Sequence, residues 1–447
     1  MSPLRPALAF CLFALVTGPA MAQLADLKDG TSNTVQFSES AAPPLRIPLS
    51  DGSVRQVSDG LSAGRGADTG SNINSLVTRG SLTGNVQQSV DAASGNQSLS
   101  VAGAEGNVRA NDARLTGGIT ADVNQNVGGT ARGAQQRVGA GSLVGSNLGR
   151  VETRGEINGA PIVQSATGGT SVQQTIEAGS VSGSQASSVV TRGSISGGVT
   201  QVQSSGLGIR QSLTAGSVSN VEAAGSILAR GTVSGAVNQL NQGAVNQSIE
   251  AGSVRGGSPL EARTQGDIVG KVNQSADQGS GGNQSLQVGS ISNTRGNVDA
   301  RGTTTGTISQ SINASANVEQ GISVGSVAGG SGQNITEAAS TGDISQTASN
   351  AGASKQNISI GGTENAGGVV TTRAFVSGNL NQNISGASGN QTINLGGVRN
   401  SSGNITTDVV VSGNISQSLS GAGAGNQRVL VGGVEGSQAS GSAVNSQ

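Results

Sequence analysis

The stretch "VNQSADQGSGGNQSLQVGSI", residues 272–291, decides the fold because it places polar side chains where a core is expected. Counting by twos, Gln274 shares a strand face with Val272. In the second half, Gln284 shares a face with Leu286. A buried amide must find hydrogen-bond partners, so the stretch predicts that something inside the protein satisfies these glutamines.

The same pair of glutamines recurs along the chain at intervals of about 36 residues, which is the range of repeat architectures. The first member stands in an aliphatic-x-Gln-x-small pattern at Gln88, Gln125, Gln164, Gln201, Gln239, Gln274, Gln310, Gln346, Gln382 and Gln417. The second member opens a Gln-x-aliphatic run at Gln97, Gln136, Gln174, Gln211, Gln247, Gln284, Gln320, Gln356, Gln391 and Gln427. Ten copies of one unit therefore make up most of the chain.

A third element in each unit carries the motif Thr/Ala-Arg-Gly, as in "VVTRGSISGGV" at 189–199 and "ILARGTVSGAV" at 227–237. Its strict period of two, with Val, Ile and Thr, indicates a strand. Glycine, Asn and Ser between the runs supply corners. Only Pro161 and Pro259 fall within the array, which suits continuous hydrogen-bond ladders.

Such units cannot each bury a core, but stacked units can. We therefore predict an all-β fold, a parallel β-solenoid (β-helix) of about ten repeats, in which like side chains lie above one another. One coil per unit gives a rod about 48 Å long, and two smaller coils per unit would double that length. The glutamines would then form two ladders, each amide bonding to its neighbours in the stack. A disordered Gly/Ser/Asn/Gln linker is the alternative, but disorder does not require phased glutamine pairs.

The chain has 447 residues with 74 Gly, 1% aromatics and 11% charged residues, which is unlike an ordinary globular protein. Near its start, the apolar run "ALAFCLFALV" followed by "GPAMA" predicts a signal peptide, residues 1–22. Cys11 raises the alternative of a lipoprotein. Removing Arg5 leaves 23 basic and 25 acidic residues, a net charge near −2 that argues against nucleic acid as a partner.

The remaining chain divides into residues 23–78, an N-terminal leader or cap that fits the repeat poorly and contains Pro43, Pro44 and Pro48, and residues 79–447, the repeat array. The last unit ends without a helix, a charge cluster or a proline. Because an open strand edge invites further strands, we expect self-association through the solenoid ends. Surface display would then depend on a separate outer-membrane exporter.

The two-glutamine pattern resembles the curlin repeat of bacterial functional amyloids, with "ISQSLSGAGAGNQRVLVGG" at 415–433 as a good example. The long, repetitive, aromatic-poor chain is also similar to the holdfast anchor proteins of stalked bacteria. The resemblance implies a surface-retained adhesion protein that polymerises or is very stable, and it transfers no catalytic residues. This chain departs from curlins in its longer turn, its third strand and its lack of tyrosine.

The sequence offers few of the residue types that catalysis or metal binding requires. Without His or Cys after residue 22, zinc sites, thiol nucleophiles and Ser-His-Asp arrangements are excluded. Acidic residues recur in no inward column, and Asp91, Asp122 and Asp277 fall in turns or near strand ends, so paired acids as in polysaccharide lyases are not expected. We therefore expect no enzyme, cofactor or metal.

One outward set of residues stands out, because arginine follows the Thr/Ala position in most units: Arg79, Arg114, Arg154, Arg192, Arg230, Arg263, Arg301 and Arg373. A line of guanidinium groups suits an anionic polysaccharide, with Arg154, Arg192, Arg230, Arg263 and Arg301 as the candidate binding column. The alternative is that Arg shields a strand edge while Glu152, Glu261 and Asp299 offset its charge.

The sequence thus predicts a secreted bacterial structural protein at the cell surface or outside the cell, namely an adhesin, surface anchor or fibre subunit of curli-like type. The alternative is a monomeric rigid solenoid that binds extracellular polysaccharide.

Overall fold

The computed structural model describes most of the repeat array and little of what precedes it. The described residues are 45–48, 54–57, 73–83, 86–91, 96–105, 109–128, 133–159, 161–168, 170–204, 206, 208–223, 225–243, 245–279, 282–314, 317–386, 388–421 and 424–446. The signal peptide predicted at 1–22 lies outside them, and so does most of the leader predicted at 23–78.

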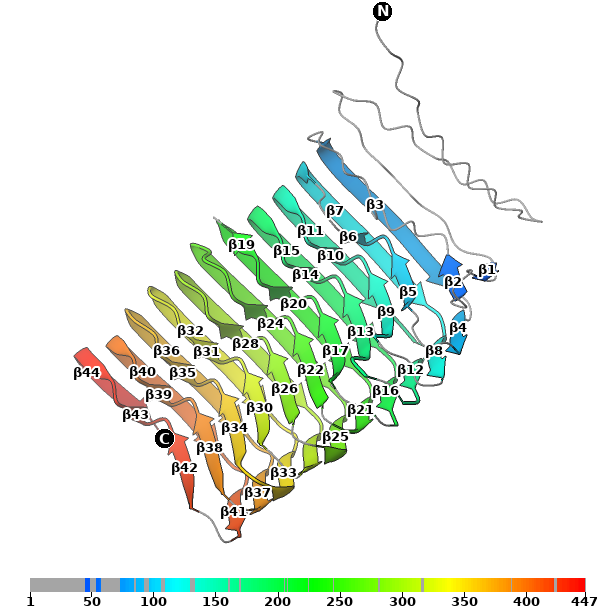
Figure 1. The fold of residues 1–447 in the computed structure, drawn as a ribbon. Helices are drawn as coiled ribbons and strands as arrows, with labels where there is room; N and C mark the ends of the chain where they lie inside the picture. Colours follow the sequence, from blue (N-terminus) through cyan, green and yellow to red (C-terminus); the bar gives the residue numbers. More distant parts are fainter. Residues whose placement is uncertain are drawn as a thin grey trace, which may run out of the picture.

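The described residues form strands and no helix, and the strands wind into a parallel β-solenoid (Figure 1). The predicted fold class is confirmed. Each repeat makes one coil of four strands, a long strand, a first-glutamine strand, a second-glutamine strand and a two-residue short strand, and equivalent strands of successive coils pair in parallel. The alternative of two coils per repeat is therefore excluded.

The four sheets run the length of the stack, and each is named here after its strands. The long sheet contains β3 (Ile73–Thr83), β7 (Arg109–Thr120), β11 (Asn147–Ile157), β15 (Gln185–Ser196), β20 (Ser226–Ser234), β24 (Glu261–Val269), β28 (Asn297–Thr305), β32 (Gln333–Ser340), β36 (Val369–Val376), β40 (Ser402–Val411) and β44 (Gln438–Ser446), with β19 (Glu222–Ala223) pairing with β15. The first-glutamine sheet contains β4 (Val86–Asp91), β8 (Val123–Gly128), β12 (Ile162–Ala166), β16 (Val199–Gln203), β21 (Val237–Gln242), β25 (Val272–Gly279), β29 (Ile308–Ala314), β33 (Ile344–Ala351), β37 (Leu380–Gly386) and β41 (Ile415–Ser420).

The second-glutamine sheet contains β5 (Asn96–Val101), β9 (Gln135–Ala140), β13 (Gln173–Ala178), β17 (Ile209–Ala215), β22 (Val245–Ala251), β26 (Gly282–Val288), β30 (Val318–Val324), β34 (Ser354–Ile360), β38 (Gly389–Leu395) and β42 (Gly425–Val431). The short sheet contains β6 (Ala104–Glu105), β10 (Leu143–Val144), β14 (Val181–Ser182), β18 (Val218–Ser219), β23 (Val254–Arg255), β27 (Ile291–Ser292), β31 (Val327–Ala328), β35 (Thr363–Glu364), β39 (Val398–Arg399) and β43 (Val434–Glu435).

Two further strands precede the stack. β1 (Leu45–Pro48) and β2 (Val54–Val57) form an antiparallel hairpin, and β2 lies against β4 and β5 of the first coil. The stack itself begins at Ile73, where β3 starts to pair with β7.

The core is a set of aliphatic columns, because the period of two sends alternate side chains inward from every strand. Along β13 the burial alternates residue by residue, and Ile176 is fully buried. Its partners in the neighbouring coils, Val138 and Leu213, are also fully buried. Since each coil buries its apolar face against the next, stability depends on stacking rather than on any single coil.

A glycine contact sets how the long strand lies against the turn after the second-glutamine strand. A Cβ at Gly193 would lie 2.0 Å from the backbone N of Gly216 and 2.2 Å from the O of Ala178. Gly216 has φ +59°, a left-handed conformation that the tight turn requires. Because the two backbones meet here, the Gly of the Arg-Gly motif aligns the long strand with the turn in the coils that carry it.

Replacing Gly193 with Ala should therefore destabilise the array by about 1–3 kcal/mol, the usual effect of overfilling a packed site. Gly198 is the matched control, since a Cβ there meets nothing within 4 Å. The midpoint of urea denaturation should fall for Gly193→Ala and stay near wild type for Gly198→Ala. Equal midpoints for the two variants would contradict this account of the register.

Candidate functional site

The two glutamine columns are continuous through the described coils and are buried in all but the last, where Gln417 is half-buried and Gln427 is exposed. Gln164 and Gln174 are each 0% exposed. Nε2 of Gln164 donates to Oε1 of Gln125, one coil earlier, at 2.7 Å. Nε2 of Gln174 donates in the same way to Oε1 of Gln136 at 2.8 Å. Each amide thus bonds to its counterpart in the coil before it.

The same bond repeats in every described pair. In the first column the donors are Gln164, Gln201, Gln239, Gln274, Gln310, Gln346, Gln382 and Gln417. In the second column they are Gln136, Gln174, Gln211, Gln247, Gln284, Gln320, Gln356, Gln391 and Gln427. The side chain of Gln88 lies outside the described residues. All these amides point the same way, so each column has a direction.

The second amide hydrogen links the two columns across the interior. Nε2 of Gln164 also donates to the backbone O of Thr175 in the facing second-glutamine strand, at 3.2 Å. Nε2 of Gln174 donates to the backbone O of Val202 in the next coil, at 3.2 Å. These cross-links satisfy amide hydrogens that would otherwise be buried without a partner. Each bond contributes about 1 kcal/mol net to the stability of the fold. The columns therefore hold two sheets together as well as specifying register.

The outward arginines do not form the single column that the sequence suggested. Arg154, Arg192 and Arg230 do pair in register along β11, β15 and β20. Arg263, however, lies beside Leu228, and Gln265 takes the place next to Arg230. The predicted place of Arg263 in the arginine column is therefore wrong.

The register glycine explains this error. Gly266 must align with Gly231, and in β24 the arginine stands three residues before the glycine instead of one. Arg114 is displaced in the same way, since Thr116 pairs with Arg154. The column also changes sign further along, because Glu337 lies between Arg301 and Arg373.

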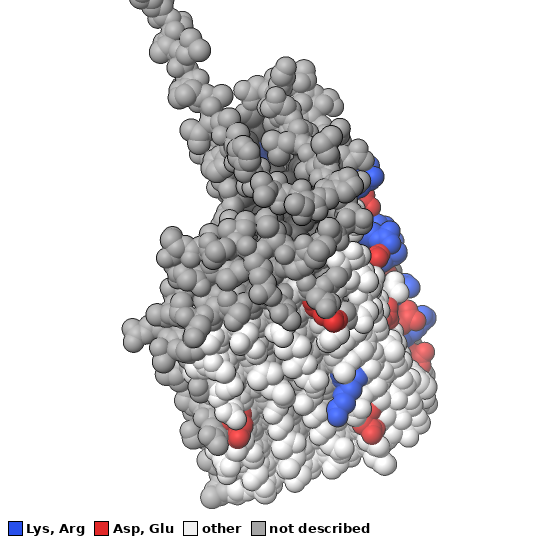
Figure 2. Space-filling model, turned by 90° about the vertical axis from the view of Figure 1, so that its right-hand side faces the viewer, with Lys and Arg blue, Asp and Glu red and all other residues white. Residues whose placement is uncertain are grey.

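Most of these arginines have an acidic neighbour. Arg154 Nη2 lies 2.5 Å from Glu156 Oε1, and Arg192 Nη1 lies 3.0 Å from Glu152 Oε1. The four side chains are between 39% and 60% exposed, so each pair contributes little to stability. Figure 2 shows one side of the molecule, on which the described surface is mostly uncharged; many of its Lys, Arg, Asp and Glu residues lie along one edge, and a few are scattered over the face. Among the described residues, only Arg154, Arg192 and Arg230 form a run of three aligned arginines.

The sequence pattern does not predict that one acidic residue, Glu250, is buried. Glu250 of β22 has the outward phase but is only 7% exposed, because it lies in a groove where the second-glutamine sheet meets the short sheet. Its Oε1 lies 2.9 Å from Nη2 of Arg255 on the following short strand. Burial raises the pKa of Glu250 above its ordinary value of 4.5, and the charge of Arg255 offsets part of that rise. The period of two gives the phase of a residue but does not reveal a concave corner.

Comparison with known proteins adds no assignment, since no family model, curated protein or solved structure matches the chain. Among the described residues, no group of three or more His, Cys, Asp or Glu side chains is placed to hold a metal ion. No helix within the described ranges is long and apolar enough to span a membrane.

We predict that Gln274→Met destabilises the array by about 1–3 kcal/mol for each buried polar group that it leaves without a hydrogen-bond partner. Gln274 donates to Gln239 and accepts from Gln310, both at 2.8 Å, so methionine keeps the volume and removes both bonds. Asn273→Ala, on the outward face of the same strand, should have little effect. Chemical denaturation and amide hydrogen exchange of β21, β25 and β29 would measure the difference. If both variants melt like wild type, the ladder does not stabilise the stack.

A second prediction concerns pH. The folded pKa of Glu250 lies above the unfolded one, so the ionised form is penalised in the fold and that penalty grows as pH rises from 4.5 upward. Glu250→Gln should therefore be more stable than wild type at neutral pH, and the gap should close below pH 4.5. Gln287 occupies the same column one coil further, so glutamine fits there. Melting temperatures across this pH range test the idea, and a gap independent of pH would contradict it.

Proposed function

We propose that the chain is a secreted bacterial structural protein, an adhesin, surface anchor or fibre subunit of curli-like type, and not an enzyme. The observation that carries the proposal is the pair of unbroken amide columns, which hold coil to coil along the array. A protein built this way transmits force along its axis through many parallel hydrogen bonds, which suits a load-bearing anchor. The predicted signal peptide supports export to the cell surface or the medium.

Self-association through the solenoid ends forms part of the proposal. In the last coil, Val429 is 45% exposed and Val434 39%, whereas their counterparts one coil earlier, Ile393 and Val398, are 0% exposed. The strands β41, β42 and β43 each have a neighbour on one side only, and β44 is in the same way the last strand of the long sheet, paired only with β40. This face therefore offers unpaired strand edges and apolar surface, both of which favour addition of another chain.

The direction of the amide columns favours one orientation of addition. Gln417 and Gln427 donate backward, so their Oε1 atoms face the end of the stack. A second copy stacked in the same direction would bring Nε2 donors to these oxygens, whereas a copy facing the opposite way would bring oxygen against oxygen. At the other end β2 lies against β4 and β5, so the hairpin would have to leave before the first coil could pair. We infer head-to-tail growth.

The alternative function is a monomeric rod that binds anionic polysaccharide. The aligned run of Arg154, Arg192 and Arg230 favours it, since Arg230 has no ion-pair partner among the described residues. Three guanidinium groups one coil apart would meet successive anionic groups of a polymer.

Val429→Lys should block assembly without unfolding the coil, because the change lies on the exposed end face and would place a charge in the contact. Asn426→Lys is the matched control, since Asn426 points outward from the same strand. Wild type and the control should give high-mass species that resist boiling in detergent and a fibre reflection near 4.8 Å. A wild-type protein that stays monomeric at high concentration would overturn self-assembly and leave the rod.

A further inference from the structure

The outer face of the long sheet changes character in its last coils. One outward column, next to the Arg column, reads Glu156, Ser194, Thr232, Asp267, Thr303, Ala339, Phe375 and Val410 in register. It is small or polar through β28 and apolar from β32 onward. Because the repeat otherwise keeps this column polar, the change is a local departure of the kind that marks functional sites.

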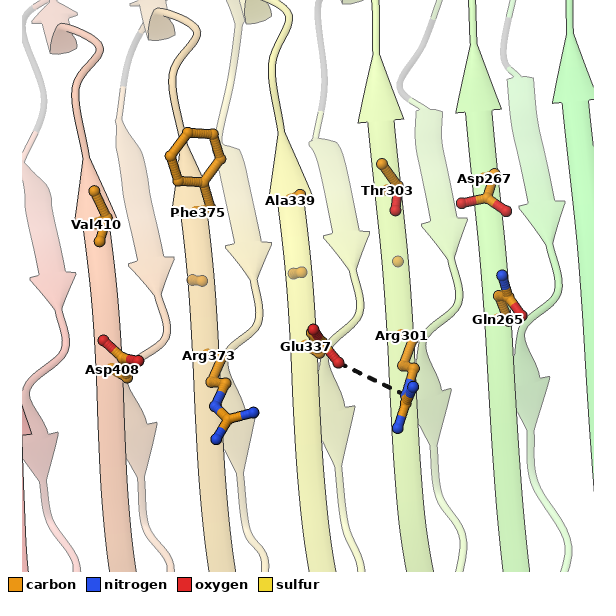
Figure 3. Close-up of a pocket in the computed structure, with 13 residues that line it drawn as sticks. Gln265, Asp267, Arg301, Thr303, Glu337, Ala339, Arg373, Phe375, Asp408 and Val410 are labelled. Atoms are coloured by element: carbon orange, nitrogen blue, oxygen red, sulfur yellow. Dashed lines mark ion pairs between the residues drawn. The ribbon is translucent and has the colours of Figure 1, made fainter.

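Phe375 is the most unusual residue in this column. It is the only aromatic residue among the described residues, and it is 44% exposed, with Val410 beside it 51% exposed. Figure 3 shows the ring lying on the surface of the sheet between Ala339 and Val410. The other described coils pack without any aromatic side chain, so packing does not explain why one is present here.

A column of alternating charge runs beside the apolar strip, which consists of Ala339, Phe375 and Val410. Arg301, Glu337, Arg373 and Asp408 lie in successive coils, and Figure 3 shows them below Thr303, Ala339, Phe375 and Val410. Arg301 Nε lies 3.8 Å from Glu337 Oε2 and 3.0 Å from Asp299 Oδ1. Arg373 has no ion-pair partner among the described residues. The two columns line a shallow hollow of about 450 Å³.

We propose that this hollow binds a neutral pyranose unit of an extracellular polysaccharide. The apolar face of the sugar ring would lie on Phe375 and Val410, and its hydroxyls would bond to the guanidinium of Arg373 and the carboxylates of Glu337 and Asp408. This combination of an apolar platform with a few convergent polar groups is typical of small-ligand sites. The hollow lies on the outer face of the long sheet and not on the end face that β41, β42 and β43 present, so the proposal does not rest on head-to-tail growth.

The local charge selects a neutral ligand over an anionic one. The hollow is lined by two arginines, Arg301 and Arg373, against three acids, Asp267, Glu337 and Asp408. A polyanion would meet as much repulsion as attraction here, whereas hydroxyl groups can both donate to the carboxylates and accept from the guanidinium groups. The aligned run of Arg154, Arg192 and Arg230 suits a polyanion better, and it lies in other coils.

The test is affinity electrophoresis of the full mature chain in native gels that contain hydroxyethyl cellulose, galactomannan or polygalacturonate. A neutral glycan should retard wild type, and Phe375→Ser should weaken binding by at least about tenfold. Arg373→Gln should weaken it several-fold. Arg192→Gln removes the same charge from the same column in another coil, and it should bind the neutral glycan like wild type. Melting temperatures would confirm that each variant folds.

The other outcomes decide against the proposal. Retardation by polygalacturonate alone, lost in Arg192→Gln and kept in Phe375→Ser, would assign binding to the arginine run. Binding of a neutral glycan that Phe375→Ser leaves intact would place the sugar elsewhere. No retardation in any gel, with less association between rods in Phe375→Ser, would make the strip a contact between copies of this chain.

Discussion

The whole structure depends on the requirement that a buried amide must be hydrogen-bonded. A glutamine inside a protein carries two hydrogens and an oxygen that water no longer satisfies, and each unsatisfied group costs about 1–3 kcal/mol. In this chain the partner of Gln201 is Gln164 one coil earlier, at 2.7 Å, and its remaining hydrogen goes to backbone oxygens across the interior. A slip of one residue in one sheet would turn these side chains to the other face and leave the groups unpaired, so the columns select one register.

The glycine contact acts where the long sheet meets the end of the second-glutamine strands. The amide columns align the two glutamine sheets, and the approach of Gly193 to Gly216 aligns the long sheet with the turn. Thr153 adds a hydrogen bond from its hydroxyl to the backbone O of Gly179, at 2.5 Å. Aliphatic columns alone tolerate exchange of Val, Ile and Leu, as at Val138, Ile176 and Leu213, and so define register poorly. Directional contacts at two corners supply what the apolar core lacks.

The sequence predicted the solenoid and the phase of the glutamines because both follow from short-range periodicity. Gln346, for example, donates to Gln310 at 2.8 Å, as its phase within the strand predicts. The arginine column was mispredicted because alignment between coils is set by the glycine and not by the nearest arginine. The burial of Glu250 could not be predicted either, since it arises from the angle between two sheets. Periodicity along one strand carries no information about that angle.

The last coils differ from the others on both faces of the long sheet. The register glycine of β28, Gly302, is followed in the same column by Ala338, Ala374 and Val409. A Cβ built at Gly325 would lie 2.5 Å from the backbone O of Glu337, whereas one built at Gly289 would lie 1.6 Å from that of Arg301, so the strand lies further from the turn where the glycine is lost. Phe375 and Val410 appear on the outer face of these same strands. Because the amide columns continue unchanged through them, the interior holds the register while the long sheet is free to vary. A solenoid with a fixed interior can therefore acquire a binding surface in a few coils without losing its fold.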